Sequence, residues 1–370
     1  MKRRVVVSLL ALVVAVPMAA APARAKNVVL LLADAAGIAT VNAASRFGYD
    51  APRKLFVQHM PFIGLSETST ASEWVTDSAA GMTAIVTGTR THNGVLAQGP
   101  DAVRGQKDGA PLTTLLDYAE EHGLSTGLIT NDSVAGATPA ALYARSNERS
   151  RLGEIVLQAF TARSGDGVDV LIGPARAERE AVAKLGKDLS LVARSSGRQI
   201  YSSLDQVPAT AARAFVFADD DQFDFPAAVN VAIKILSRNP KGYFLMIESD
   251  AHTDRPEKGL RHLVAFDSLI ERLSRQLSSD TLLLFTADHS FDLRIHDGGT
   301  GKKLLEGLDP AAPSASPTLR LPFVRIDDTH TGEEVLVAAQ GPGAERVHGY
   351  LANTDLFHIM LDAWGWTLRR

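Results

Sequence analysis

The stretch KNVVLLLADAAG, Lys26–Gly37, decides the fold class. Its apolar part, Val28–Leu32, is continuous rather than alternating, which is typical of a strand covered on both faces of a sheet. Comparable runs recur along the chain, at Ser125–Ile129, Val168–Ile172, Ala214–Phe217, Tyr243–Ile247, Thr281–Phe285, Pro322–Ile326 and Val335–Ala339. We therefore predict a sheet built mostly from buried strands.

Helical patterns separate these strand-like runs. They cover Leu112–Glu121, Leu152–Ala162, Ala227–Ser237, Leu260–Leu277 and Thr354–Trp364. Alternating strands and helices indicate an α/β fold with three layers, α/β/α, around a mainly parallel central sheet. No convincing boundary interrupts residues 26–370, so we predict one domain there, with Pro310–Pro317 as a surface loop.

The first 25 residues have the features of a signal peptide. Met1–Arg4 is basic, Val5–Val16 is an apolar run too short to span a bilayer comfortably, and Ala23–Ala25 offers the small residues that a signal peptidase recognises. We predict cleavage after residue 25 and a periplasmic or secreted protein, with no membrane association after cleavage. The alternative is an uncleaved membrane anchor.

Composition narrows the function classes. The chain has 370 residues, a net charge of −4 and no cysteine. This charge argues against a nucleic-acid-binding surface, which needs clustered lysine and arginine. Without disulfides, stability must come from core packing and bound metal.

Carboxylates and imidazoles follow four of the predicted strands. They are Asp34, then Glu248, Asp250 and His252, then Asp288 and His289, and finally His330. A single Asp after a strand is usually a turn former, but four such strand ends favour a common site beyond the carboxyl edge of the sheet. Oxygen and imidazole ligands suit catalytic Zn²⁺, and oxygen ligands alone suit Mg²⁺.

A candidate nucleophile lies in the stretch VTDSAAGMTA, Val75–Ala84. Ser78 begins a helical pattern, where free N–H groups and the helix dipole favour a bound anion. The alternative is that Asp77 or Ser78 simply caps the helix. The sequence has no Walker or GxGxxG motif. Its GxSxG match, Gly123–Gly127, leads into the predicted strand Ser125–Ile129 and not from a strand into a helix, so it is no nucleophile elbow. A serine-histidine-aspartate hydrolase or a nucleotide-binding loop therefore lacks support.

The stretch Val75–Thr83, followed by Thr87 and Gly88, resembles the nucleophile signature of the alkaline phosphatase family. Further segments resemble segments of that family and follow one another in the same order along the chain. They are Lys26–Gly37, Gly136–Arg149, Thr286–His289, His330–Gly332 and Thr354–Phe357. The resemblance implies an alkaline phosphatase-like catalytic domain over residues 26–370. It also implies small-molecule phosphate monoesters as substrates, and a homodimer is one option for assembly.

The resemblance assigns roles residue by residue. Ser78 would attack phosphorus and form a phosphoserine, and Arg149 would clamp the phosphate oxygens with two hydrogen bonds. Two Zn²⁺ and one Mg²⁺ are implied as cofactors. Ser78 would also bind one zinc ion, together with Asp34, Asp288 and His289. The magnesium ligands would be Asp34, Thr138 and Glu248.

Two departures from the family pattern concern the metals. Familiar members place an Asp five residues after the glutamate and a His four residues beyond that, but the chain has Thr253 and Glu257 at those positions. In addition, Gly136 stands where some members carry a carboxylate or an imidazole near the third metal. The third site could therefore be weaker or filled differently.

A shorter loop after Glu248 would still supply ligands for the second zinc ion. His252 precedes Pro256 by the family's four residues, and Asp250 shares a face with it in an extended chain. We predict that Asp250, His252 and His330 hold this zinc. Asp254 is the competing carboxylate, and the other alternative is that both aspartates are turn residues.

The sequence predicts a metal-dependent phosphate monoester hydrolase. One alternative is a phosphodiesterase or sulfatase on the same scaffold, although the sequence has no Cys-x-Pro-x-Arg or Ser-x-Pro-x-Arg motif for a sulfatase. The other is a catalytically impaired protein that binds metal or phosphate.

Overall fold

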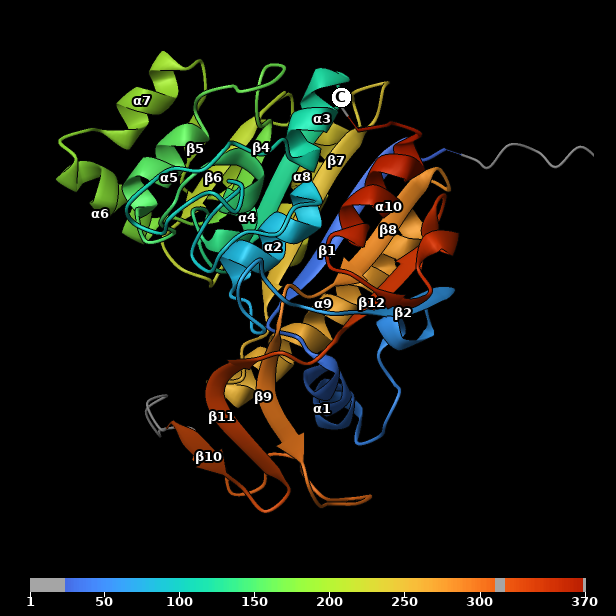
Figure 1. The fold of residues 1–370 in the computed structure, drawn as a ribbon. Coiled ribbons are helices and arrows are strands. Elements are labelled where there is room, and N and C mark those ends of the chain that lie inside the picture. The colour runs from blue at the N-terminus through green and yellow to red at the C-terminus, as the bar shows by residue number, and fades with distance from the viewer. Residues whose placement is uncertain (1–23, 310–316, 369–370) are drawn as a thin grey trace, which may run out of the picture.

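A computed structural model describes residues 24–309 and 317–368 (Figure 1). The described residues contain a ten-stranded sheet in the order β13-β2-β12-β8-β1-β7-β3-β4-β6-β5, in which β12 alone runs antiparallel to its neighbours. The strand bounds are β1 Asn27–Asp34, β2 Phe62–Ser66, β3 Ser125–Thr130, β4 Val170–Pro174, β5 Ile200–Tyr201, β6 Ala214–Ala218, β7 Tyr243–Asp250, β8 Thr281–Thr286, β12 Val335–Gln340 and β13 Gly349–Leu351. The predicted α/β fold with a mainly parallel central sheet is confirmed.

Helices cover both faces of this sheet, and its central strands are therefore buried on both sides. Every residue of β1 is buried, with Val28 and Leu30 facing one apolar core and Val29 and Leu31 facing the other. The first core includes α2 Ser78–Thr87, α3 Leu115–Glu121, α4 Ala137–Tyr143, α5 Leu152–Gln158, α6 Arg176–Lys184, α7 Leu189–Ser195 and α10 Asp355–Trp364. The second includes α1 Ile38–Tyr49, α8 Phe225–Leu236 and α9 Pro256–Gln276.

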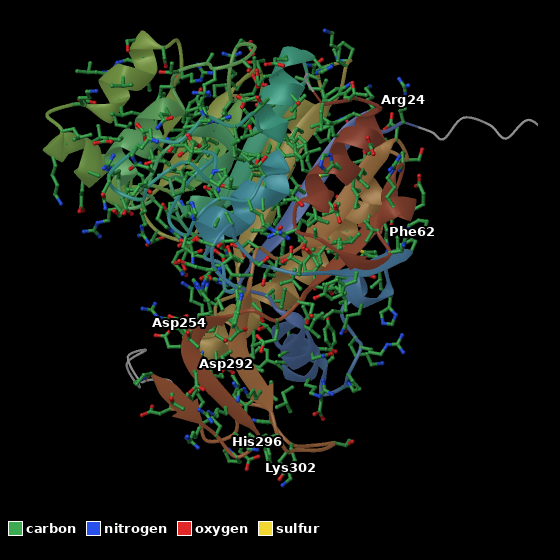
Figure 2. The ribbon with its side chains drawn as sticks, viewed as in Figure 1. Arg24, Phe62, Asp254, Asp292, His296 and Lys302 are labelled. Carbon is green, nitrogen blue, oxygen red and sulfur yellow. The ribbon has the colours of Figure 1, made fainter. Side chains whose placement is uncertain are left out.

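A second, three-stranded sheet projects from the end of the main sheet (Figure 1). Its order is β10-β11-β9, with β9 Ser290–Ile295, β10 Thr318–Arg320 and β11 Val324–Thr331. Its outer end carries polar side chains, among them His296 and Lys302 (Figure 2). The predicted strand Pro322–Ile326 therefore belongs to this small antiparallel sheet and not to the main one.

Two predictions fall largely outside the described residues. Residues 1–23 of the predicted signal peptide and 310–316 of the predicted loop are not described. Ala25 is described and buried, and its N–H donates to the carbonyl of Ala363 at 2.7 Å. No helix among residues 24–309 and 317–368 is long and apolar enough to cross a membrane.

Candidate active site

The paired ends of β1 and β7 place three carboxylates on one face of the sheet. In the parallel register Asp34 lies opposite Asp250, and Leu32 lies opposite Glu248. Alternate residues of a strand share a face, so Asp34, Glu248 and Asp250 point to the same side as Leu32. Leu32 belongs to the core that contains α2 and α4. The carboxylates therefore face the layer that carries the predicted nucleophile.

Ser78 is the first residue of α2, and Asp77 caps that helix. The Asp77 carboxylate accepts a hydrogen bond from the N–H of Ala80 at 3.0 Å. The capping alternative therefore applies to Asp77. Ser78 is buried, and its Oγ lies 3.1 Å from Nε2 of His289. The hydroxyl thus faces the residues that follow β8.

A glycine lets α2 approach β8 closely. A Cβ atom on Gly81 would lie only 2.6 Å from the carbonyl oxygen of Asp288. No side chain can be accommodated there without displacing the backbone of one of the two elements. Gly81 therefore sets the distance between the nucleophile helix and the Asp288–His289 pair.

The first predicted metal group comes together as expected. Asp34, Asp288 and His289 each offer a ligand atom, and the three atoms lie within 4.8 Å of one another. All three residues are buried, and Oδ2 of Asp288 has no hydrogen-bond partner. Oδ1 of Asp34 has no contact of hydrogen-bond geometry and lies 3.3 Å from Nε2 of His289. Buried oxygens without partners are costly unless a cation or proton satisfies them. This donor set fits a bound metal.

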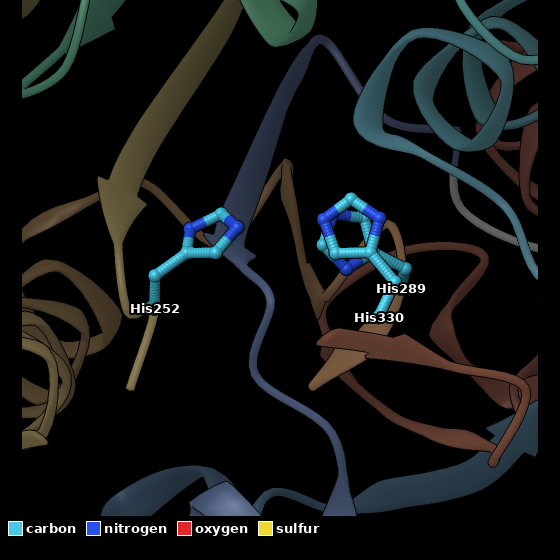
Figure 3. Close-up of side chains that lie close together, drawn as sticks. All are labelled: His252, His289 and His330. Atoms are coloured by element: carbon cyan, nitrogen blue, oxygen red, sulfur yellow. The ribbon is translucent and has the colours of Figure 1, made fainter. Parts of the chain in front are cut away.

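Three histidines form a second group, His252, His289 and His330 (Figure 3). The ring centroids of His289 and His330 are 4.1 Å apart, and those of His252 and His289 are 5.6 Å apart. His330 does not follow its strand as predicted but lies within β11, opposite Phe291 of β9. The pairing of β9 with β11 therefore carries His330 to the edge of the main sheet.

Asp250 lies beside His252 but outside this three-histidine group. Its carboxylate accepts hydrogen bonds from Nδ1 of His252 at 2.9 Å and from the His252 N–H at 3.0 Å. A carboxylate in this position fixes the ring orientation of a ligating histidine. Asp254 is also outside both groups of candidate ligands found among the described residues. Direct metal binding by Asp250 stays a prediction.

Glu248 and Thr138 have the features expected of the third site. Both residues are 1% exposed, and Oε2 of Glu248 and Oγ1 of Thr138 lack hydrogen-bond partners. Burial, followed by the nearby charges of Asp34 and Asp132, raises the pKa of Glu248 well above its ordinary value. A buried acid surrounded by like charges is a group that a cation would stabilise in its ionised form.

The pKa values of the other candidate ligands are shifted in different directions. Burial, with Asp34 next, raises the pKa of Asp288 to about 6. Burial also acts on His252, but Asp34 and Asp250 outweigh it and raise the pKa of that imidazole to about 10. Burial and the neighbouring His289 and His252 lower the pKa of His330 to about 4. Perturbations of this size in one cluster are typical of functional sites.

Arg149 lies beside the start of α2, the helix that begins with the candidate nucleophile Ser78. Its Nη1 donates to the Asp77 carboxylate at 3.0 Å, and its backbone N–H donates to the carbonyl of Gly94 at 2.9 Å. About a third of its side chain is exposed, at 32%. The guanidinium is therefore oriented by Asp77 and still accessible to an anion.

Sequence reasoning missed Asn131 and Asp132, which follow β3. Asn131 Oδ1 accepts from the N–H of Asp250 at 2.7 Å, and Asp132 contributes to the raised pKa of Glu248. The signal was present, because both residues directly follow the predicted strand Ser125–Ile129 and its neighbour Thr130. The rule that identified the other four strand ends applies equally to this one.

Comparison with known proteins gives a consistent picture. The family model described as alkaline phosphatase matches residues 25–176 and 221–310. The chain is 26% identical to an alkaline phosphatase of Gadus morhua, with 92% of each chain covered. It is 28% identical to a streptomycin-6-phosphate phosphatase of Streptomyces griseus, with 93% of this chain and 91% of the relative covered.

Solved structures share the fold. The alkaline phosphatase of Thermus thermophilus aligns with a TM-score of 0.76 at 21% identity, over 94% of this chain and 93% of the other. That of the Antarctic bacterium TAB5 aligns with a TM-score of 0.75 at 22% identity, over 94% of this chain and all of the other. Together with the family match over well over half of the sequence, these findings establish that the chain belongs to the alkaline phosphatase family and is a phosphatase.

Proposed function

We propose that the protein is a metal-dependent hydrolase of phosphate monoesters that works through a phosphoserine on Ser78. One observation carries this proposal: Ser78 Oγ lies 3.1 Å from Nε2 of His289, within the buried group of Asp34, Asp288 and His289. A hydroxyl in that position could reach a phosphorus atom held at the N-terminus of α2.

The donor atoms fit the implied metals. Imidazole and carboxylate ligands suit zinc at the two histidine-containing groups. At the second we assign His252 and His330, joined by Asp250, whose carboxylate lies 2.9 Å from Nδ1 of His252. Oxygen ligands from Asp34, Thr138 and Glu248 suit magnesium, and each of these residues has an unpartnered buried oxygen. Bound metals supply charge neutralisation on the phosphate oxygens and activate the attacking and leaving oxygens.

The side chains of the protein then have defined tasks. The Arg149 guanidinium, oriented by Asp77, binds two phosphate oxygens. Ser78 Oγ loses its proton and forms a bond to phosphorus as the bond between phosphorus and the alcohol oxygen breaks, and the departing oxygen takes up a proton to leave as the alcohol. Water then attacks the phosphoserine, the bond between phosphorus and Ser78 Oγ breaks, and inorganic phosphate is released.

The proposal for the cellular location of the enzyme rests on the sequence. The basic and apolar start of the chain supports a signal peptide of 25 residues and a periplasmic or secreted enzyme. Its expected substrates are small-molecule phosphate monoesters, and homodimerisation stays a prediction.

The covalent route is tested by acid quenching with a substrate labelled in its phosphoryl group. We expect the label on the peptide containing Ser78 and expect Ser78→Ala to abolish it and to lower turnover by orders of magnitude. A label on any other residue would refute the assignment. Nitrophenyl mono- and diesters, with metal analysis of the purified protein, distinguish a monoesterase from a diesterase and from an inactive binding protein.

A further inference from the structure

The surface beside the nucleophile carries an aromatic residue that the proposed chemistry does not use. Trp74, four residues before Ser78, is 92% exposed. An indole buries a large apolar area when it is covered, so its full exposure leaves a strong contact surface unoccupied. Trp74 lines a depression of about 420 Å³ whose wall also includes Glu73, Asn93 and His330.

This depression adjoins the candidate active site. Thr76 forms part of its wall and precedes Asp77, the cap of the nucleophile helix. His330 of β11 also lines the depression, and it belongs to the three-histidine group. The alcohol part of a phosphate ester bound at Ser78 would therefore be within reach of this depression.

The loop that carries Trp74 is held in place by hydrogen bonds. Asn93 Oδ1 accepts from the Asp77 N–H at 2.7 Å, and Asn93 Nδ2 donates to the Val75 carbonyl at 3.1 Å and to the Glu73 carboxylate. The loop also packs against the end of β11, because a Cβ on Gly332 would lie 3.1 Å from the Trp74 carbonyl oxygen. A fixed loop loses little conformational entropy when it binds a ligand.

We propose that this depression is the subsite for the alcohol part of the substrate and that it accepts a ring bearing hydroxyl or amino groups. This inference rests on the proposed phosphatase reaction at Ser78. The face of the Trp74 indole is suited to pack against the apolar C–H face of a saturated ring. Next to it, the Glu73 carboxylate accepts hydrogen bonds from hydroxyl or ammonium groups on that ring. The preferred substrates are phosphorylated sugars or similar cyclic alcohols.

The test compares a ring ester with a linear one. The ratio of kcat/KM for glucose 6-phosphate to kcat/KM for glycerol 3-phosphate is measured for the wild type and three variants. We expect Trp74→Ala to lower this ratio about tenfold, as the stacking face is lost, and Trp74→Phe to keep most of it. Tyr49→Ala removes a partly exposed aromatic residue outside the depression and should leave the ratio unchanged.

The outcomes separate the two proposals. An unchanged ratio in Trp74→Ala, with normal wild-type turnover, overturns the subsite and leaves the phosphatase reaction in place. A wild type that hydrolyses neither ester refutes the proposed reaction and the subsite with it. Because the variants are compared by a ratio, a general loss of folded protein affects both esters equally and does not imitate the predicted change.

Discussion

A single carboxylate, that of Asp77, links the helix that begins at Ser78, the proposed nucleophile, to Arg149, the proposed phosphate-binding residue. One of its oxygens caps α2 at the N–H of Ala80, and the other accepts from the N–H of Gly94 and from Arg149. Any shift of the helix therefore shifts the guanidinium with it. This connection explains how two residues 71 positions apart, Ser78 and Arg149, can keep a fixed separation.

Arg149→Lys tests whether that guanidinium binds phosphate. Lysine keeps the charge but loses the two-pronged geometry, so we expect the inhibition constant of inorganic phosphate to rise about tenfold, roughly the effect of one charge-assisted hydrogen bond. Thermal unfolding should change little, because the side chain is partly exposed. Arg104→Lys, in an exposed ion pair with Glu148, is the matched control. An unchanged inhibition constant would show that Arg149 does not contact phosphate.

At the scale of the element, the contact between α2 and the end of β8 is decided by Gly81. At an unconstrained helix position, alanine would stabilise the protein relative to glycine by about 0.5–1 kcal/mol. Here the added Cβ meets the Asp288 carbonyl at 2.6 Å, so we expect Gly81→Ala to destabilise by about 1–3 kcal/mol and to lower metal content. Urea unfolding and metal analysis measure both effects.

A control separates the close contact from helix propensity. Ala80→Gly, one residue earlier in α2, should lose about 1 kcal/mol of stability but keep its metal, because it removes a methyl group without moving Asp288. Stabilisation by Gly81→Ala would mean that the two elements can separate freely.

The segment after β7 provides the second prediction at this scale. Asp250 is the last residue of that strand and contacts His252, whereas Asp254 lies closer to the start of α9. We expect His252→Ala and Asp250→Asn to lower the metal-to-protein ratio and Asp254→Asn to leave it unchanged. Loss of metal in Asp254→Asn, with retention in Asp250→Asn, would refute this assignment.

The same elements show what local sequence can and cannot predict. Strands such as Val28–Leu32 were predictable because burial on both faces leaves a continuous apolar run. The strand β2 was missed although its residues Phe62, Ile63 and Leu65 are apolar. Its run is short, follows Pro61 and contains Gly64, and proline and glycine are residue types that are typical of turns. His330 was correctly singled out, but its place beside His289 depends on the pairing of β9 with β11, and the sequence does not encode pairing partners locally.

For the whole molecule, bound metal should act as a stabilising ligand. The central oxygens come from β1, β7, α4 and the segment after β8, so a cation there would hold together elements from both halves of the chain. The unfolded chain cannot assemble these groups, and a ligand bound only by the native state stabilises it by about 2.7 kcal/mol at 100 times its dissociation constant. Chelation should therefore lower the thermal midpoint, and divalent cations should restore it.

Glu248→Gln examines the third site without relying on activity. Glutamine has nearly the shape of the protonated acid, the form that burial and the neighbouring charges of Asp34 and Asp132 favour in the metal-free protein. After chelation we therefore expect the wild type and the variant to unfold at similar temperatures. Titration with Mg²⁺ should then raise the midpoint of the wild type and of Glu257→Gln, a change in a solvent-facing ion pair, but not that of Glu248→Gln. An equal rise in all three proteins would place magnesium elsewhere, because a site that needs an ionised oxygen ligand cannot tolerate its replacement by a neutral amide.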